Sequence, residues 1–371
     1  MVRLSISSLL ISSLSAVLLI VVLSTILKRE KTYSIFRSDF LNLFYTMILI
    51  RLFFPVELLN TITIPSLRIL PAIYNTLEYH MKFFSISITI YQVVGIIWLS
   101  GTIVFVIRLI INTLKLNHLM QNIKGKSKQL PTKQYISSNK VPIYISSCVD
   151  SPMTSGLLHP IIIIPDHNYS ELEIYNVLLH ELQHIQNKDV AKKYIIEILT
   201  CIYWWLPFVY LLRKQISLII ELNVDSQVTE KMSSEDYFNY MNSLVSVQEK
   251  RKTNQTHING QPIAAYFTNY HQSTLSKRVE FLFNGFKRKK TNKLILALLL
   301  VSVLTVTSFI FEPKRYDKNL IQNTFEIHKP ASQYILKTKN GQYILYINDK
   351  NMGAISNIDD PSLKDIPIKD E

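Results

Sequence analysis

Long stretches without a charged residue constrain this chain more than any other feature of its sequence. Residues 4–27 and 83–107 carry no charge, residues 294–311 form a third such run, and only Arg51 interrupts a fourth at 40–56. A helix rises about 1.5 Å per residue, so about 20 apolar residues cross a hydrocarbon core of roughly 30 Å. The sequence therefore predicts four transmembrane helices at these ranges, with Arg51 pairing inside the membrane or reaching its surface.

The distribution of Lys and Arg predicts which side of the membrane each segment occupies. Basic residues gather in three short segments, at 28–37, 108–128 and 287–293. The segment 55–82, by contrast, carries only Arg68 and Lys82. We therefore expect residues 1–111 to hold three spans with the N-terminus outside, 112–293 to form a cytoplasmic domain, and 312–371 to be a short extracellular tail.

The same distribution accounts for the net charge. The chain has 40 Lys+Arg against 27 Asp+Glu, a formal net charge of +13. Because the basic clusters flank the predicted spans, the charge indicates orientation in a lipid bilayer, and no direct nucleic-acid partner is expected. A cleaved signal peptide is disfavoured, since the first apolar run is too long and no small-residue cleavage site precedes Lys28.

The cytoplasmic segment combines strand and helix patterns. Runs rich in Ile and Val predict strands at 141–147 and 159–166, and the edge of these strands either docks an extended substrate or is purely structural. Ser170 and Glu173 form a capping box that begins a helix. The charge-free stretch 198–212, which contains a proline, is either a re-entrant element or a helix buried beside that helix, and its length favours the buried helix.

A polar stretch with little periodicity follows between Glu249 and Ser276. It predicts a loop, which is either an ordinary connector or the site of self-cleavage.

The predicted helix contains the sequence His180-Glu181-Leu182-Gln183-His184. Residues four apart share one helix face, so both imidazoles can reach a single Zn²⁺, while Glu181 can take a proton from a metal-bound water. Zinc lowers the pKa of its water toward roughly 7, which provides a nucleophile at neutral pH. The pattern predicts a zinc metalloprotease, although a solvated helix face can carry the same residues by chance.

A catalytic zinc needs a third protein ligand, and acidic residues further along the chain offer it. Glu221 is a plausible ligand from a second helix, and Asp225 one turn later is placed to accept the second N–H of a liganding histidine. Asp189 is another candidate for that supporting role. Glu221 and Asp225 also fit a simpler interpretation, as solvated residues on a helix surface.

These motifs resemble the BlaR/MecR family of membrane zinc metalloproteases. The resemblance rests on HELQH, on Glu221 and Asp225 in the form E-x-x-x-D 37 residues after His184, and on the segments SSCVDSPMTSGLLHPIIIIPD and WWLPFVYLLRK. It implies a mainly α membrane protein with four spans and a cytoplasmic α+β, gluzincin-like protease domain. It also implies that His180, His184 and Glu221 hold zinc, that Glu181 is the general base, and that Asp225 supports the site.

Members of the resembled family carry an outer domain that binds a β-lactam, and their protease cleaves itself and causes loss of a DNA-binding repressor. Residues 312–371 contain neither a Ser-x-x-Lys nor a Lys-Thr-Gly motif. The segments QYILKTK and QYILYIN instead flank Asn340-Gly341, which predicts a β-hairpin with a type I′ turn. Covalent β-lactam sensing by these residues is therefore not expected.

The sequence thus predicts an integral membrane zinc metalloendopeptidase with a regulatory role at the cytoplasmic face. Its substrate would be a protein, with a cytoplasmic transcriptional repressor as the candidate that the resemblance implies. Two alternatives stay open, a quality-control protease of the HtpX type and a zinc-binding receptor that cuts nothing. Glu181 argues against the receptor, because a purely structural site needs no general base.

Overall fold

The computed structural model describes most of the chain in separate ranges. These are residues 6–28, 38–55, 62–83, 86–130, 141–254, 271–285, 294, 297, 309–313, 333–338, 341–355, 358, 363 and 366–370. The chain divides into two compact units, Met1–Lys314 and Arg315–Glu371.

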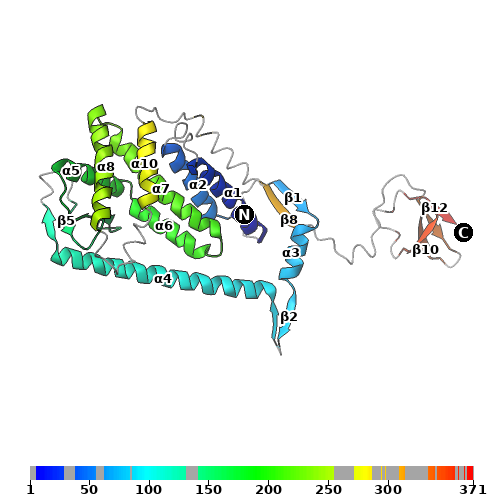
Figure 1. Cartoon of the computed structure of the whole chain (residues 1–371). Helices are drawn as coiled ribbons and strands as arrows, with labels where there is room; N and C mark the ends of the chain where they lie inside the picture. Colours follow the sequence, from blue (N-terminus) through cyan, green and yellow to red (C-terminus); the bar gives the residue numbers. More distant parts are fainter. Residues whose placement is uncertain are drawn as a thin grey trace. The chain divides into compact units, whose positions relative to one another are not determined.

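Three helices of the first unit correspond to predicted spans (Figure 1). They are α1 (Ile6–Lys28), α2 (Ser38–Phe53) and α4 (Ile90–Lys126). Among the described residues, Ser8–Lys28 and Ile90–Gly125 are long and apolar enough to cross a membrane. The predicted span at 294–311 lies almost wholly outside the described residues, and its last three residues begin a strand, β8 (Phe309–Pro313).

The third predicted span was wrong in its limits. Its first residues form the hairpin of β2 (His80–Phe83) and β3 (Ile86–Thr89), and the helix begins only at Ile90. The Thr89 side chain accepts a hydrogen bond from the Gln92 N–H, and Gln92 caps the Thr89 N–H in return, which fixes this start. The helix then continues to Lys126, far beyond residue 107, because charged residues do not end a helix that has no proline.

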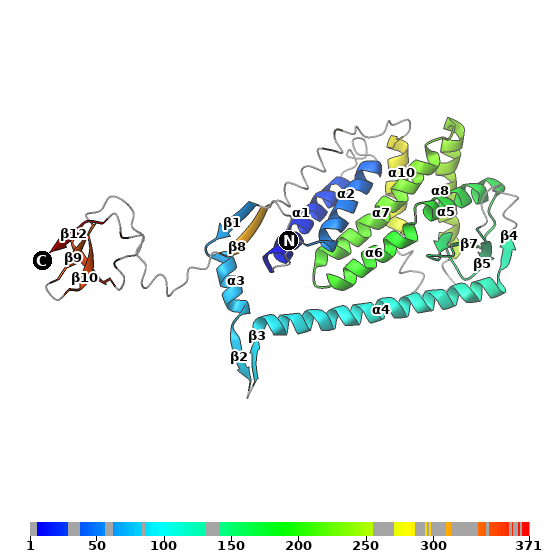
Figure 2. The same ribbon diagram turned by 180° about the vertical axis from the view of Figure 1, so that it is seen from behind.

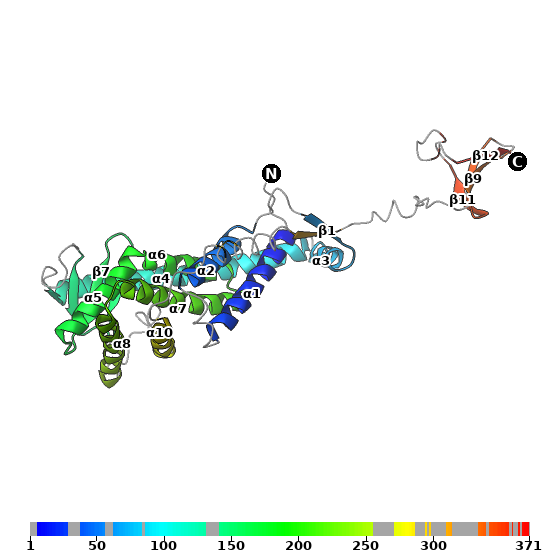
Figure 3. The ribbon, with the colours of Figure 1, turned by 90° about the horizontal axis from the view of Figure 1, so that it is seen from above.

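Helices α1 and α2 pack with two helices of the predicted cytoplasmic segment, α6 (Asp189–Ile202) and α7 (Pro207–Thr229). The four helices lie together in the ribbon (Figure 3), and apolar side chains from all four form one buried cluster. Arg51 on α2 is buried here and its Nε lies 3.4 Å from Ser15 Oγ on α1, so the charge that interrupts the second apolar run pairs with a polar group inside the bundle.

The long helix α4 runs alongside α6 on another side of this bundle (Figure 2). The predicted single helix at 198–212 was wrong, because α6 ends at Ile202 and α7 begins at Pro207. Proline lacks an N–H and has a fixed φ, so it suits the first position of a helix and not its middle. The stretch is therefore the turn and the flanking ends of a helical hairpin.

Two strands far apart in sequence pair beside this bundle. Strand β1 (Ile62–Ser66) runs parallel to β8, with Ile62 opposite Phe309. Helix α3 (Ile69–Leu77) follows β1 and leads to the β2–β3 hairpin.

The part of the first unit that follows α4 contains a four-stranded sheet in the order β4-β5-β7-β6. Its members are β4 (Lys128–Leu130), β5 (Ile143–Ser146), β6 (Met153–Ser155) and β7 (Ile161–Pro165). The two predicted strands, β5 and β7, are confirmed and run parallel, while β6 is antiparallel to β7. Strand β6 lies between the two predicted strands and was not predicted, since its three residues are too few to show a pattern.

Helix α5 (Glu171–Gln186) begins at the predicted capping box, where Ser170 and Glu173 cap each other. Helices α8 (Ser234–Asn254) and α10 (His271–Gly285) complete this part. The predicted loop 249–276 is therefore helical at both ends, and residues 255–270 lie outside the described residues.

The second unit holds a four-stranded sheet in the order β11-β10-β9-β12. Its strands are β9 (Gln333–Lys337), β10 (Tyr343–Ile347), β11 (Lys350–Ala354) and β12 (Ile368–Asp370). The predicted hairpin, β9–β10, is confirmed. Its two-residue turn was wrong, because the Thr338 N–H donates to Gln342 O and Gly341, with φ of 76°, is the last of three loop residues.

Candidate metal centre

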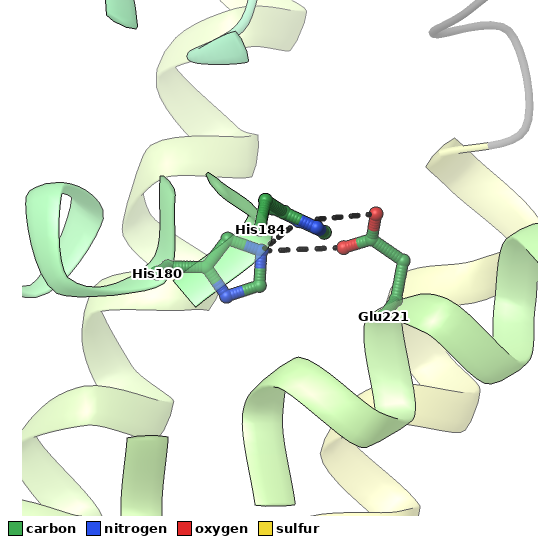
Figure 4. Close-up of side chains that lie close together, drawn as sticks. All are labelled: His180, His184 and Glu221. Carbon is green, nitrogen blue, oxygen red and sulfur yellow. Dashed lines mark hydrogen bonds and ion pairs between the residues drawn. The ribbon is translucent and has the colours of Figure 1, made fainter. Parts of the chain in front are cut away.

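Two helices bring the predicted ligands together. Helix α5 carries His180 and His184 on one face, and α7 presents Glu221 opposite them (Figure 4). Both histidines are buried, each 7% exposed. Leu178 and Leu182 of α5 pack against the sheet, which turns the histidine face toward α7.

The spacing of the donor atoms fits a single small cation. His180 Nε2 lies 3.1 Å from His184 Nε2 and 3.3 Å from Glu221 Oε2, and His184 Nε2 lies 3.6 Å from Glu221 Oε1. Zinc ligands at 2.0–2.1 Å in a tetrahedron are separated by about 3.3 Å. Within the described part of the chain, these three residues form a cluster whose ligand atoms all lie within 4.8 Å of one another. The donor set therefore fits zinc in both chemistry and size.

The second nitrogen of each histidine has a polar partner. His184 Nδ1 lies 2.8 Å from Asp189 Oδ2, and Lys192 Nζ lies 2.7 Å from the other oxygen of Asp189. His180 Nδ1 lies 2.8 Å from the Tyr240 hydroxyl. Such contacts fix the tautomer and orientation of a ligand histidine. The structure places Asp189 in the supporting position that the sequence suggested.

Tyr240, on α8, extends the chain of contacts to Asp225 on α7. Its hydroxyl donates to Asp225 Oδ1 at 2.8 Å, while Asp225 Oδ1 itself lies 3.3 Å from His180 Nδ1. The Asp225 side chain is fully buried, which excludes the interpretation as a solvated surface residue. Asp225 therefore reaches His180 mainly through the hydroxyl.

A guanidinium from α10 balances the two carboxylates of α7. Arg278 donates to both oxygens of Asp225 at 2.7 Å, and its Nη1 lies 3.1 Å from Glu221 Oε2. Burial alone raises the pKa of a carboxyl group, but Arg278 lowers the pKa of Asp225 to about 2 and that of Glu221 well below its usual value. Both groups are therefore ionised at neutral pH, as metal binding requires.

Glu181 lies beside this cluster, in a cavity of about 120 Å³ that the three clustered residues also line. Its Oε2 accepts a hydrogen bond of 2.8 Å from the Thr154 hydroxyl on β6, and the same hydroxyl contacts the Glu181 carbonyl oxygen. The edge strand β6 thus restrains the carboxylate at the mouth of the site. Met153 and Thr154 of β6 form part of the cavity wall.

Sequence reasoning brought together His180, Glu181, His184, Glu221, Asp225 and Asp189, and the structure gathers all six. It missed three residues, Thr154, Tyr240 and Arg278. The apolar spacing of Leu275, Val279 and Leu282 around Arg278 was a usable signal for a buried arginine. No comparable sequence pattern identified Thr154 and Tyr240, because these residues reach the metal centre only through the packing of β6 and α8 against α5.

Two curated bacterial proteins are similar to this chain in sequence. The methicillin resistance mecR1 protein of Staphylococcus aureus is 22% identical over 278 residues, which cover 71% of this chain and 46% of that protein. The regulatory protein BlaR1 of Bacillus licheniformis is 29% identical over 153 residues, covering 39% of this chain and 26% of that protein. The chain thus spans less than half the length of these curated relatives.

The sequence model described as BlaR1 peptidase M56 matches residues 4–282, well over half of the chain. The match includes the histidine pair of α5, Glu221 of α7 and Arg278 of α10. The chain therefore belongs to the BlaR1 peptidase M56 family of metallopeptidases.

Proposed function

We propose that this protein is an integral membrane zinc metalloendopeptidase that cleaves a regulatory protein at the cytoplasmic face. His180, His184 and Glu221 hold the zinc, and Glu181 is the general base. The observation that carries this proposal is the separation of 3.1 to 3.6 Å among the donor atoms of two helices, which matches tetrahedral zinc.

Residues of the chain have separate roles around the metal. Bound zinc supplies an activated water near neutral pH and polarises the scissile carbonyl. Glu181 takes a proton at its carboxylate and returns it to the leaving amine, and Thr154 keeps that carboxylate oriented. Asp189 and Tyr240 hold the imidazoles in the tautomer that leaves Nε2 free to bind the metal.

The substrate backbone docks along β6. Among the described residues this strand pairs with β7 alone, so its other edge is open for an extended peptide. Thr154 on this strand contacts Glu181 directly. A peptide added to the edge would therefore run past the general base.

Two observations support a topology with α2 and the fourth apolar run both ending outside. Strand β1 follows α2, β8 contains the last three residues of the run at 294–311, and these strands pair with each other in parallel. The chain therefore leaves both segments on the same side. The basic clusters after α1 and before residue 294 support a cytoplasmic location for the opposite ends.

The names of the relatives favour regulation over quality control. One is called a methicillin resistance protein and the other a regulatory protein. We propose a cytoplasmic transcriptional repressor as the substrate, and cleavage of this chain itself within 255–270 as a companion event. A quality-control protease would instead cut many unrelated membrane proteins.

The test measures zinc content and proteolysis of the full chain in membranes, with a co-expressed repressor from the same genome as reporter. Glu181→Gln should retain zinc and lose about 10²- to 10⁴-fold of the cleavage rate, whereas Glu221→Gln should lose zinc. Glu171→Gln, on the exposed first turn of the same helix, is the matched control and should match the wild type. Full cleavage by Glu181→Gln would refute the assigned chemistry.

A further inference from the structure

The hairpin of α6 and α7 has an apolar tip. Residues 198–212 contain no charged side chain, and the turn between the helices carries Trp204 and Trp205. Both arms start from the metal centre, since Asp189 begins α6 and Glu221 lies on α7. The chain therefore leaves the site along α6 and returns to it along α7.

The tip lies beside the apolar half of α4. The Trp98 indole donates to Ile202 O at 3.0 Å, the Trp204 indole donates to Trp98 O at 3.2 Å, and the Trp204 ring stacks on Phe105 with centroids 6.1 Å apart. Gly101 permits this contact, because a Cβ there would overlap the Trp204 ring. All these α4 residues precede Arg108, the first charge after the apolar run 83–107.

The tip also meets the far end of α2. The Tyr203 hydroxyl donates to Leu52 O at 2.8 Å, one residue before α2 ends at Phe53. By the proposed topology this is the end of α2 nearest the outside. The hairpin therefore reaches well past the cytoplasmic ends of the neighbouring spanning helices.

The charged residues of the hairpin stop at Glu197, five residues before α6 ends at Ile202. Arg213 Nε on α7 lies 2.6 Å from Glu197 Oε1 on α6, and Arg108 of α4 interacts with the same carboxylate. Glu197, Arg213 and Arg108 are thus the charged residues nearest the tip on α6, α7 and α4, and they lie at one level. Beyond this level α6, α7 and α4 carry no charged side chain.

The metal centre is level with the cytoplasmic end of α1. Lys277 Nζ on α10 donates to Leu27 O, one residue before the end of α1 at Lys28. Lys277 immediately precedes Arg278, which contacts Asp225 and Glu221. A helix of 14 residues, the length of α6, covers about 21 Å. The hairpin therefore projects from the membrane surface by less than the thickness of the hydrocarbon core.

The outer face of the hairpin matches acyl chains and not water. Large apolar side chains on it are exposed, from 36% for Tyr210 to 47% for Trp205, with Ile195 and Ile198 between them. The exposed apolar face of α4 continues this surface, and no residue of α4 from Ile90 to Lys115 is buried. Tryptophan and tyrosine favour lipid surroundings in which a polar end finds a partner.

We propose that the α6–α7 hairpin inserts into the lipid bilayer from the cytoplasmic side as a re-entrant element and does not cross it. Its tip at residues 203–206 lies among acyl chains, and the metal centre sits in the plane where the spanning helices end. Substrates are then cut next to the membrane surface. This inference rests on the proposed topology and not on the peptidase chemistry.

The native fluorescence of the chain tests the inference directly. The sequence has three tryptophans: Trp98 and Trp204 lie at the contact with α4, and Trp205 lies beside Trp204 in the turn. The full chain is reconstituted in phosphatidylcholine vesicles, with or without bromine at mid-chain carbons, and quenching by bromine is compared with quenching by aqueous acrylamide. Trp98→Phe removes the α4 reporter and leaves the two tip residues.

We expect Trp98→Phe, like the wild type, to be quenched severalfold more by brominated lipid than by acrylamide. The control replaces all three tryptophans with Phe and adds Phe238→Trp, a 47% exposed position on α8, and it should show the reverse order. Acrylamide quenching equal to this control would overturn the proposal, because the tip would be in water. Quenching by neither agent would also overturn it, because protein would then cover the tip. Neither readout depends on cleavage.

Discussion

Replacing Tyr240 with Phe removes one hydroxyl from the second coordination sphere of the proposed zinc site. That hydroxyl lies 2.8 Å from His180 Nδ1 and donates to Asp225 Oδ1 at 2.8 Å. Loss of such a partner weakens metal binding by about 10- to 100-fold. Asp225 Oδ1 already lies 3.3 Å from His180 Nδ1 and can take over part of the contact. We therefore expect the lower end, about tenfold or ~1.4 kcal/mol.

Zinc affinity is measured by competition with a chelator on the detergent-solubilised full chain. Tyr237→Phe is the matched control, since this buried tyrosine on the same helix donates to Leu282 O at 2.6 Å and, unlike Tyr240, does not line the cavity at the metal centre. It should lower stability by about 1 kcal/mol and leave zinc affinity unchanged. Equal zinc affinity in Tyr240→Phe and the wild type would refute the reasoning, as would an equal loss in both variants.

Three further outcomes are expected. In the metal-free protein, burial lowers the pKa of His180, but hydrogen bonds to two carboxylates raise it to about 9. Protonated His180 therefore stabilises the folded state fully below about pH 6.5, and this stabilisation is lost as the pH rises through 9. Zinc must displace that proton, so zinc affinity should rise from pH 7 to 9 and then level off, and a pH-independent titration would contradict this. Gly101→Ala should lower the thermal midpoint through overlap with Trp204, whereas Gly95→Ala on the same helix, with open space around it, should not. Ser170→Ala should cost about 1 kcal/mol through the lost cap of α5 without changing zinc affinity, which thermal melts and the chelator assay check together.

Local patterns predicted the parts of the site that lie on one helix. The i, i+4 spacing of His180 and His184 and the capping box at Ser170 depend on neighbours within a few residues, and the structure shows the expected helix. Glu221 needed the resemblance to a family as well. The face of α7 that carries Glu221 meets α5 only because the two helices pack together in the folded chain.

The remaining contacts depend on which helix faces meet in the folded chain. Arg278 is 53 residues from Asp225 and Tyr240 is 60 residues from His180, and no short-range pattern encodes such pairs. The limits of α4 were missed for a different reason, since hydropathy reports where a helix enters lipid and not where its hydrogen bonding begins or ends.

The contacts of α10 and β8 with the earlier part of the chain determine what a backbone cut at 255–270 would do. Arg278 pairs with Asp225 and Glu221 across the cut, and β8 pairs with β1 along five residue pairs. The two pieces would therefore stay associated as a non-covalent complex with the metal centre complete. Chains 1–254 and 271–371, expressed separately in one cell, should reassemble in the same way and co-purify. A cut at this position would therefore change how freely the two pieces move and would not remove the protease.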